Sequence, residues 1–200
     1  MLKRNILVIL VAVESLFLFP ITYQPNLRFD YIQTLARWFA KAVPPETVFI
    51  GDSITSSGMQ FHSFRSINIA SAGLQTYQVL EELERAKTFK PKHIVAMAGT
   101  NDAGEGPIDE AEIIGLWQKL CAEPRMIVTL PTPTNYDHLN QRLAVIDRII
   151  LRTCTKTPII DLRELADKTG RIRPIYTVDG VHPSPAAHEI WRKKLGALGI

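Results

Sequence analysis

The sequence has little cysteine, little glycine and proline, and no long run of basic residues. Only 2 of the 200 residues are cysteine, which excludes a disulfide-rich scaffold and a cysteine-rich metal module. The 11 glycines and 13 prolines are too few for a low-complexity chain. The net charge is only +3, so nucleic acid is not expected as the main partner. With 46% hydrophobic residues, the chain is expected to form one globular domain of ordinary size.

The N-terminus has the features of a membrane-targeting segment. Lys3 and Arg4 precede an apolar run over residues 6–23, and a helix of that length spans about 27 Å, close to the ~30 Å hydrocarbon core. Glu14 opposes insertion, but the Leu, Ile, Val and Phe residues of the run outweigh it. No pair of small residues marks a cleavage site, which favours an uncleaved signal anchor over residues 1–24. A cleaved signal peptide is the close alternative, and a buried helix of a soluble domain is a weaker one.

Either targeting signal leaves the rest of the chain extracytoplasmic, as a membrane-anchored or secreted protein. Residues 25–45 are expected to form a connector with one amphipathic helix, because apolar residues recur there at spacings of three and four. Pro44 and Pro45 end that helix. The main domain is expected to occupy residues 46–200.

In residues 46–200, short β-rich runs alternate with helical stretches. Strands are expected at 47–50, 66–69, 93–97, 126–130 and 158–161. Helices are expected at 77–89, 108–121, 139–153 and from Pro185 onward, with Ser184 as the N-cap of the last. This alternation implies βαβ units and a parallel sheet covered on both faces. In such sheets the functional loops follow the carboxyl ends of the strands.

Polar and glycine-containing segments stand where such a sheet places its active site. They are Gly51-Asp52-Ser53 after the first strand, a loop ending at Gly73 after the second, Gly99-Thr100-Asn101-Asp102 after the third, and Asp179-Gly180-Val181-His182 after the last. Ser53 is the candidate nucleophile, His182 the candidate base, and Asp179 the candidate group that orients the base. Candidate oxyanion-hole donors are the N–H groups of Ser53 and Gly73 and the Asn101 side chain.

These four blocks resemble those of the SGNH hydrolases, also called the GDSL-like lipase/esterase superfamily. The resemblance covers residues 46–200 and implies a flavodoxin-like three-layer α/β/α sandwich with a five-stranded parallel sheet. It implies the same triad of Ser53, Asp179 and His182 and the same oxyanion donors. One departure is Ala70, which stands where many members have a glycine.

The leading interpretation is a metal-independent serine ester hydrolase that acts through an acyl-enzyme and needs no cofactor. Its substrate is expected to be a small-molecule, glycan or lipid ester, as for a carbohydrate acetylesterase, a lipase or a lysophospholipase. An O-acyltransferase acting on a cell-surface glycan has the same triad, and a non-catalytic glycan-binding protein is the weaker alternative. The histidines and cysteines lack zinc-ligand spacing, so no metal site is expected.

Several residues outside the four blocks also carry expectations. Tyr77, Tyr136 and Tyr176 are expected in or beside the loops that rim the site. Asp102 is expected to brace its loop, and His188 to lie on a helix surface. Cys121 and Cys154 each end a helix that leads into the next strand. In an exported domain they can form a disulfide if those strands are neighbours, and two buried free thiols are an equally open alternative.

Overall fold

The computed structural model describes residues 44–58 and 65–200. The chain divides into two compact units, Met1–Pro44 and Pro45–Ile200, and the elements named below belong to the second. The expected membrane-targeting segment and the amphipathic helix over residues 25–45 lie outside the described residues, apart from the two prolines at the end. Within the described residues, no helix combines the length and the hydrophobicity that crossing a membrane requires.

Five parallel strands form one sheet in the order β2-β1-β3-β4-β5. The strands are β1 (Thr47–Gly51), β2 (Ser66–Asn68), β3 (His93–Met97), β4 (Met126–Thr129) and β5 (Ile159–Ile160). This is the flavodoxin-like strand order, in which the chain reverses direction across the sheet between β1 and β3. Each strand lies where an apolar run predicted one, so the prediction of a parallel α/β sheet is confirmed.

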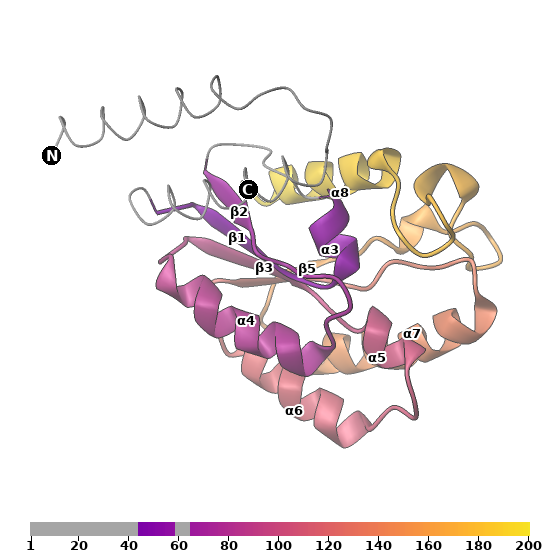
Figure 1. Cartoon of the computed structure of the whole chain (residues 1–200), viewed down its shortest axis with the longest axis horizontal. Helices are drawn as coiled ribbons and strands as arrows, with labels where there is room; N and C mark the ends of the chain where they lie inside the picture. The colour runs from indigo at the N-terminus through magenta and orange to yellow at the C-terminus, as the bar shows by residue number, and fades with distance from the viewer. Residues whose placement is uncertain (1–43, 59–64) are drawn as a thin grey trace, which may run out of the picture. The chain divides into compact units, whose positions relative to one another are not determined.

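Helices cover both faces of the sheet (Figure 1). The helices α4 (Thr76–Thr88), α6 (Glu110–Cys121) and α7 (Asp137–Thr153) lie on one face, and α3 (Ser53–Gly58) and α8 (Pro185–Ala197) lie on the other. Three short helices connect the larger elements: α5 (Thr100–Gly104), η1 (Arg163–Leu165) and η2 (Pro174–Tyr176). The sequence does not predict α3 or these three, because such short segments complete fewer than two turns and show no hydrophobic periodicity.

The core on the α8 face ties the last helix to the sheet. One buried cluster joins Trp191 of α8 to three strands of the sheet. Its members from the sheet are Phe49 on β1, Val95 and Met97 on β3, and Ile127 on β4. Trp191 is fully buried, and its indole N–H donates to the Thr129 hydroxyl at 3.1 Å. This bond anchors α8 at the carboxyl end of β4 and thereby helps to position the chain segment that precedes α8.

His188 is buried in α8, so the prediction of a surface histidine is wrong. Its side chain is 8% exposed, and its ring stacks on Trp191 with the ring centroids 6.4 Å apart. Residues three apart lie on the same face of a helix. Because Trp191 is buried in the core, His188 lies on the face of α8 that packs against the sheet. Gly58 makes room for the imidazole, because a Cβ atom at Gly58 would lie 1.7 Å from His188 Nε2.

Cys121 and Cys154 form a disulfide, as the first of the two sequence alternatives predicted. Cys121 ends α6 and Cys154 caps α7, and the two Cα atoms are 5.4 Å apart. The strands that follow, β4 and β5, pair directly, which brings both cysteines to the same edge of the sheet. That edge holds the amino ends of the strands, opposite the loops that contain Ser53 and His182.

Reduction of this disulfide is expected to destabilise the protein without abolishing activity. The bridge joins residues 33 apart, and the chain-entropy estimate for a loop of that size is roughly 3–4 kcal/mol. For a domain of this size the melting temperature should fall by about 6–16 °C. Thermal unfolding with and without a reductant measures the change, and a Cys121→Ala/Cys154→Ala variant should not respond to the reductant. Equal melting temperatures for the oxidised and reduced wild type would contradict the estimate.

Candidate active site

The turn after β1 places Ser53 at the first residue of α3. Gly51 has a φ of +148°, and a Cβ atom there would lie 2.4 Å from the Met97 carbonyl oxygen on β3. The side chain of any other residue would therefore push β1 and β3 apart at this point. The Asp52 Oδ1 atom then accepts the Ile54 N–H at 3.0 Å, which turns the chain into the helix.

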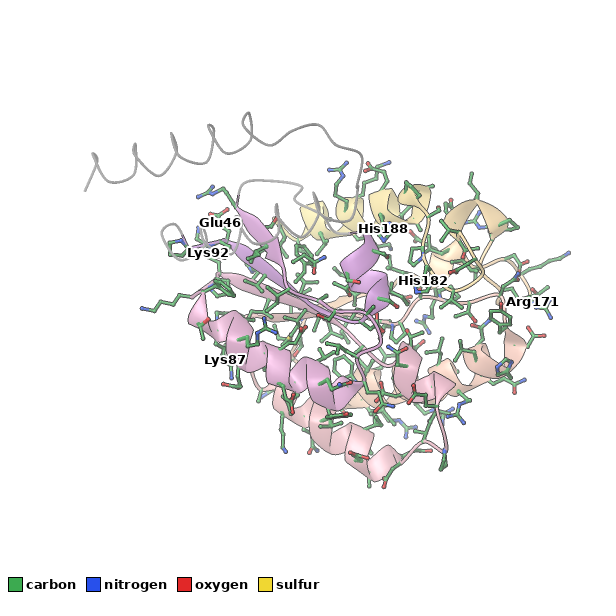
Figure 2. The ribbon with its side chains drawn as sticks, in the orientation of Figure 1. Glu46, Lys87, Lys92, Arg171, His182 and His188 are labelled. Atoms are coloured by element: carbon green, nitrogen blue, oxygen red, sulfur yellow. A yellow bond between two sulfur atoms is a disulfide. The ribbon has the colours of Figure 1, made fainter. Side chains whose placement is uncertain are left out.

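Ser53, His182 and Asp179 come together in one chain of side-chain contacts. His182 Nε2 lies 2.9 Å from Ser53 Oγ, although the two residues are 129 apart in sequence. His182 Nδ1 lies 2.6 Å from Asp179 Oδ2. Asp179 Oδ1 accepts the N–H groups of Val181 at 2.9 Å and His182 at 2.8 Å. Figure 2 shows His182 beside α3, the helix that Ser53 begins.

The environment of Asp179 keeps its carboxyl group ionised. The backbone N–H groups of His182 and Val181, followed by the His182 side chain, lower the pKa of Asp179 to about 2. At neutral pH the carboxylate can therefore accept the Nδ1–H of His182. That hydrogen bond leaves Nε2 of the neutral imidazole as an acceptor facing the Ser53 hydroxyl.

Two further loops bring Gly73 and Asn101 to the same edge of the sheet. The Asn101 side-chain amide donates to the Leu74 carbonyl at 2.8 Å, and the Asp102 carboxylate accepts the N–H and the hydroxyl of Thr76. Asp102 thus braces its loop, as expected. Gly73 is exposed with a φ of +79°. Within the described part of the chain, the N–H groups of Ser53 and Gly73 have no hydrogen-bond acceptor, so both remain available to a ligand.

Ala70, the one departure from the motif of the family that the sequence resembles, is compatible with this arrangement. Among the described non-glycine residues only Lys90 has a positive φ, so the backbone at Ala70 does not need a glycine. The Ala70 N–H donates to Asn68 Oδ1 at 3.0 Å, and Asn68 Nδ2 donates to the Thr55 carbonyl at 2.8 Å. Buried Asn68 therefore fixes the loop after β2 against α3.

Asp52 has a buried position that the sequence pattern does not reveal. Its side chain is fully buried beside Ser53. Burial raises the pKa of Asp52 to about 6, against the opposing effects of the Ile54 N–H and the nearby Thr100 hydroxyl. The only sequence signal is an acidic residue that follows the apolar run Val48-Phe49-Ile50 and Gly51. Asp52 is a supporting group under the site rather than a group that faces it.

The Asp52→Asn variant is expected to become more stable relative to wild type as the pH rises from 4 to 7. Because the folded-state pKa is raised from 3.8 to about 6, the stabilising contribution of the protonated wild-type carboxyl is lost as the pH rises through about 6. Asparagine keeps the acceptor for Ile54 and does not titrate. The unfolding free energy of Asp52→Asn, minus that of wild type, should therefore grow by about 2–3 kcal/mol from pH 4 to pH 7. Urea unfolding at the two pH values measures this, and a pH-independent difference would contradict it.

Of the three tyrosines expected at the rim, Tyr136 packs beside Gly180 in the loop that holds Asp179 and His182. A Cβ atom at Gly180 would lie 3.6 Å from Tyr136 Cε2, and the Tyr136 side chain is 47% exposed. Tyr176 instead packs against the Arg173 guanidinium, whose carbon lies 4.5 Å from the ring centroid. Tyr77 is exposed in the first turn of α4. Within residues 44–58 and 65–200, no three His, Cys, Asp or Glu side chains are grouped so that they could hold a metal ion.

Comparisons with known proteins identify a family for this chain. The family model described as "GDSL-like Lipase/Acylhydrolase family" matches residues 49–190. No curated protein sequence matches the chain.

Solved structures share the fold at low sequence identity. A GDSL-like lipase from Bacteroides thetaiotaomicron is similar with a TM-score of 0.68 and 21% identity, over 83% of this chain and 96% of that one. A variant of an acetyl-xylooligosaccharide esterase from Geobacillus is similar with a TM-score of 0.63 and 20% identity, over 77% of this chain and 94% of that one. The family match covers more than half of the sequence, so the chain belongs to the GDSL-like lipase/acylhydrolase family and is an ester-hydrolysing enzyme.

Proposed function

We propose that this chain is an exported serine esterase that works through a covalent acyl-enzyme. The observation that carries the proposal is the continuous contact from Ser53 Oγ to His182 Nε2 at 2.9 Å and from His182 Nδ1 to Asp179 Oδ2 at 2.6 Å. A hydroxyl is a weak nucleophile unless an adjacent base takes its proton, and the base needs a third group to hold its orientation. These three side chains supply all three parts.

The proposed reaction begins when His182 Nε2 takes the proton of Ser53 as Oγ attacks the ester carbonyl carbon. Negative charge then develops on the carbonyl oxygen, and the N–H groups of Ser53 and Gly73 and the Asn101 amide are the proposed donors to it. His182 gives the proton to the leaving alcohol, and the acyl group stays on Ser53. Water repeats the sequence, releases the acid and restores the Ser53 hydroxyl.

The proposed substrates are small acyl esters, with carbohydrate acetyl esters favoured. One similar structure is that of an acetyl-xylooligosaccharide esterase, which supports this class. The chain should hydrolyse p-nitrophenyl acetate, and it should release acetate from acetylated xylo-oligosaccharides faster than fatty acid from a lysophospholipid. Faster hydrolysis of the lysophospholipid would contradict the carbohydrate substrate class and indicate a lipid substrate instead. Absence of hydrolysis with every ester would contradict the proposed function.

Export is a separate part of the proposal. The sequence of Lys3 and Arg4 followed by the apolar run over residues 6–23 supports it. The Cys121–Cys154 disulfide also supports it, because disulfides persist in oxidising compartments. Fractionation of cells that express the full chain should recover it in the membrane or outside the cytoplasm. Recovery in the soluble cytoplasm with both thiols free would contradict export.

A further inference from the structure

A groove runs along the flank of α7, separate from the triad. It has a volume of about 720 Å³, which is within the range of known ligand sites. One wall is the segment after β4 at residues 131–133, a second is α7 from Asn140 to Arg152, and the third consists of residues from 163 to 170 around η1. Because twelve helical steps rise about 18 Å, the groove is long enough for an extended ligand.

Positive charge dominates the lining of the groove. Four cations line it: Arg148, Arg152, Arg163 and Lys168. Arg163 pairs with the Asp161 carboxylate at 2.5 Å. Among the residues that the structure describes, the side chains of the other three make no ion pair and no hydrogen bond. Three unpaired cations along one groove attract a ligand that carries several negative charges.

The groove also offers hydrogen-bond acceptors. Asp147 lines it, and Oδ2 is the oxygen of this carboxyl group that a ligand can reach, because Oδ1 is buried without a hydrogen-bond donor in the described part of the chain. Burial raises the pKa of Asp147 to about 7, so its charge opposes the cations only partly at neutral pH. The Asp167 carboxylate is already bonded to the N–H and the hydroxyl of Thr169. A ligand that fits this lining needs hydroxyl donors as well as negative groups.

One short segment of the chain joins the lining of the groove to the loop that holds Asp179 and His182. Pro133 lines the groove, and two residues later the Asn135 N–H donates to the Gly180 carbonyl at 2.6 Å, next to Asp179. Two extended residues span only about 7 Å. Asn140 fastens this segment, because its Oδ1 accepts the Thr134 N–H at 2.8 Å and its Nδ2 donates to the Gly170 carbonyl at 3.2 Å. In Figure 2, Arg171, which follows Gly170, and His182 are labelled on the right, and Glu46 and Lys92 are labelled on the left.

We propose that this groove binds the acidic glycan chain that carries the ester, so that the acyl group reaches Ser53. The inference rests on the proposed esterase function and adds a substrate class to it. Arg148, Arg152 and Lys168 would pair with carboxylates of the chain, and arginine does so with two parallel hydrogen bonds. Sugar hydroxyls would donate to Asp147. A nucleic acid fits less well, because no aromatic side chain lines the groove for bases to stack on.

Titration calorimetry with the full chain tests this proposal, with an oligogalacturonate as the acidic probe. A neutral xylo-oligosaccharide of equal length and a single-stranded DNA oligonucleotide are the comparison ligands. The groove variant is Arg148→Glu/Arg152→Glu. The matched control, Lys119→Glu/Lys193→Glu, makes the same charge change at exposed positions of α6 and α8 outside the groove.

The oligogalacturonate should bind more tightly than either comparison ligand. The groove variant should weaken that binding by at least about tenfold, whereas the control should stay within about twofold. Hydrolysis of p-nitrophenyl acetate should be equal in all three proteins. Equal affinity for the neutral oligosaccharide, tighter binding of the DNA, or an unchanged affinity in the groove variant would overturn the inference. Loss of p-nitrophenyl acetate hydrolysis in the wild type would instead show failure of the proposed esterase function.

Discussion

Replacement of Ser53 by alanine is expected to lower kcat for p-nitrophenyl acetate by about 10³-fold or more. The proposed acyl-enzyme forms on Ser53 Oγ, and among the described residues no other hydroxyl lies within hydrogen-bond distance of His182 Nε2. The fold should not change, because in the described structure the Ser53 hydroxyl makes no hydrogen bond to a backbone group. Steady-state kinetics of the variant, together with its circular dichroism spectrum and melting temperature, measure both parts.

Ser57→Ala is the matched control for this experiment. Ser57 lies on the same helix, α3, and its hydroxyl donates to the Ile54 carbonyl at 3.2 Å rather than to His182. Its replacement should leave kcat within about twofold of wild type. If Ser53→Ala keeps turnover within tenfold of wild type while remaining folded, Ser53 is not the nucleophile.

Replacement of Asp179 by asparagine is expected to lower kcat by about 10³–10⁴-fold. Asparagine can still accept the N–H groups of Val181 and His182 through Oδ1, so the loop should keep its conformation. It cannot supply the carboxylate that accepts Nδ1–H, and its amide can donate to Nδ1 and thereby favour the wrong tautomer of His182. Because the pKa of Asp179 is about 2, the wild-type group is ionised throughout the pH range of an esterase assay.

Asp109→Asn is the corresponding control. Asp109 caps α6 by accepting the Glu112 N–H at 3.0 Å, and asparagine is an equally good N-cap. Both variants lose one carboxylate, but only Asp179→Asn should lose turnover. Equal kcat values for the two variants would remove Asp179 from the proposed triad.

The positions of the strands and the contact between Ser53 and His182 could be predicted from the sequence. Each strand is an apolar β-rich run, and each polar block follows such a run where parallel strands place their functional loops. The sequence leaves open whether Cys121 and Cys154 form a disulfide or remain two free thiols. The disulfide requires β4 and β5 to be neighbours, and the sequence alone does not give the order of the strands. The prediction that His188 lies on a helix surface is wrong, because in the folded chain its ring fills the space beside Gly58. The sequence does not show that α3 and α8 meet at this point.

The buried state of Asp52 and the groove along α7 could not be predicted in the same way. Asp52 is buried between the end of β1 and the start of α3, with Thr100 of α5 beside it, and a sequence pattern does not show how closely these elements pack. Arg148 and Arg152 lie one turn apart on α7, but Arg163 and Lys168 join them only through the path of the chain after β5. A charge cluster that comes from separate segments is a property of the tertiary structure.

The most direct test of the proposed triad is to label the full chain with a serine-directed fluorophosphonate and to locate the adduct by mass spectrometry. A fluorophosphonate reacts with a serine that an adjacent base has activated, so it reports the contact between Ser53 and His182 independently of any substrate. We expect one adduct per chain, on Ser53, that is absent in Ser53→Ala and slow to form in Asp179→Asn. An adduct on another residue, or no adduct on folded wild-type protein, would show that Ser53 is not the activated nucleophile.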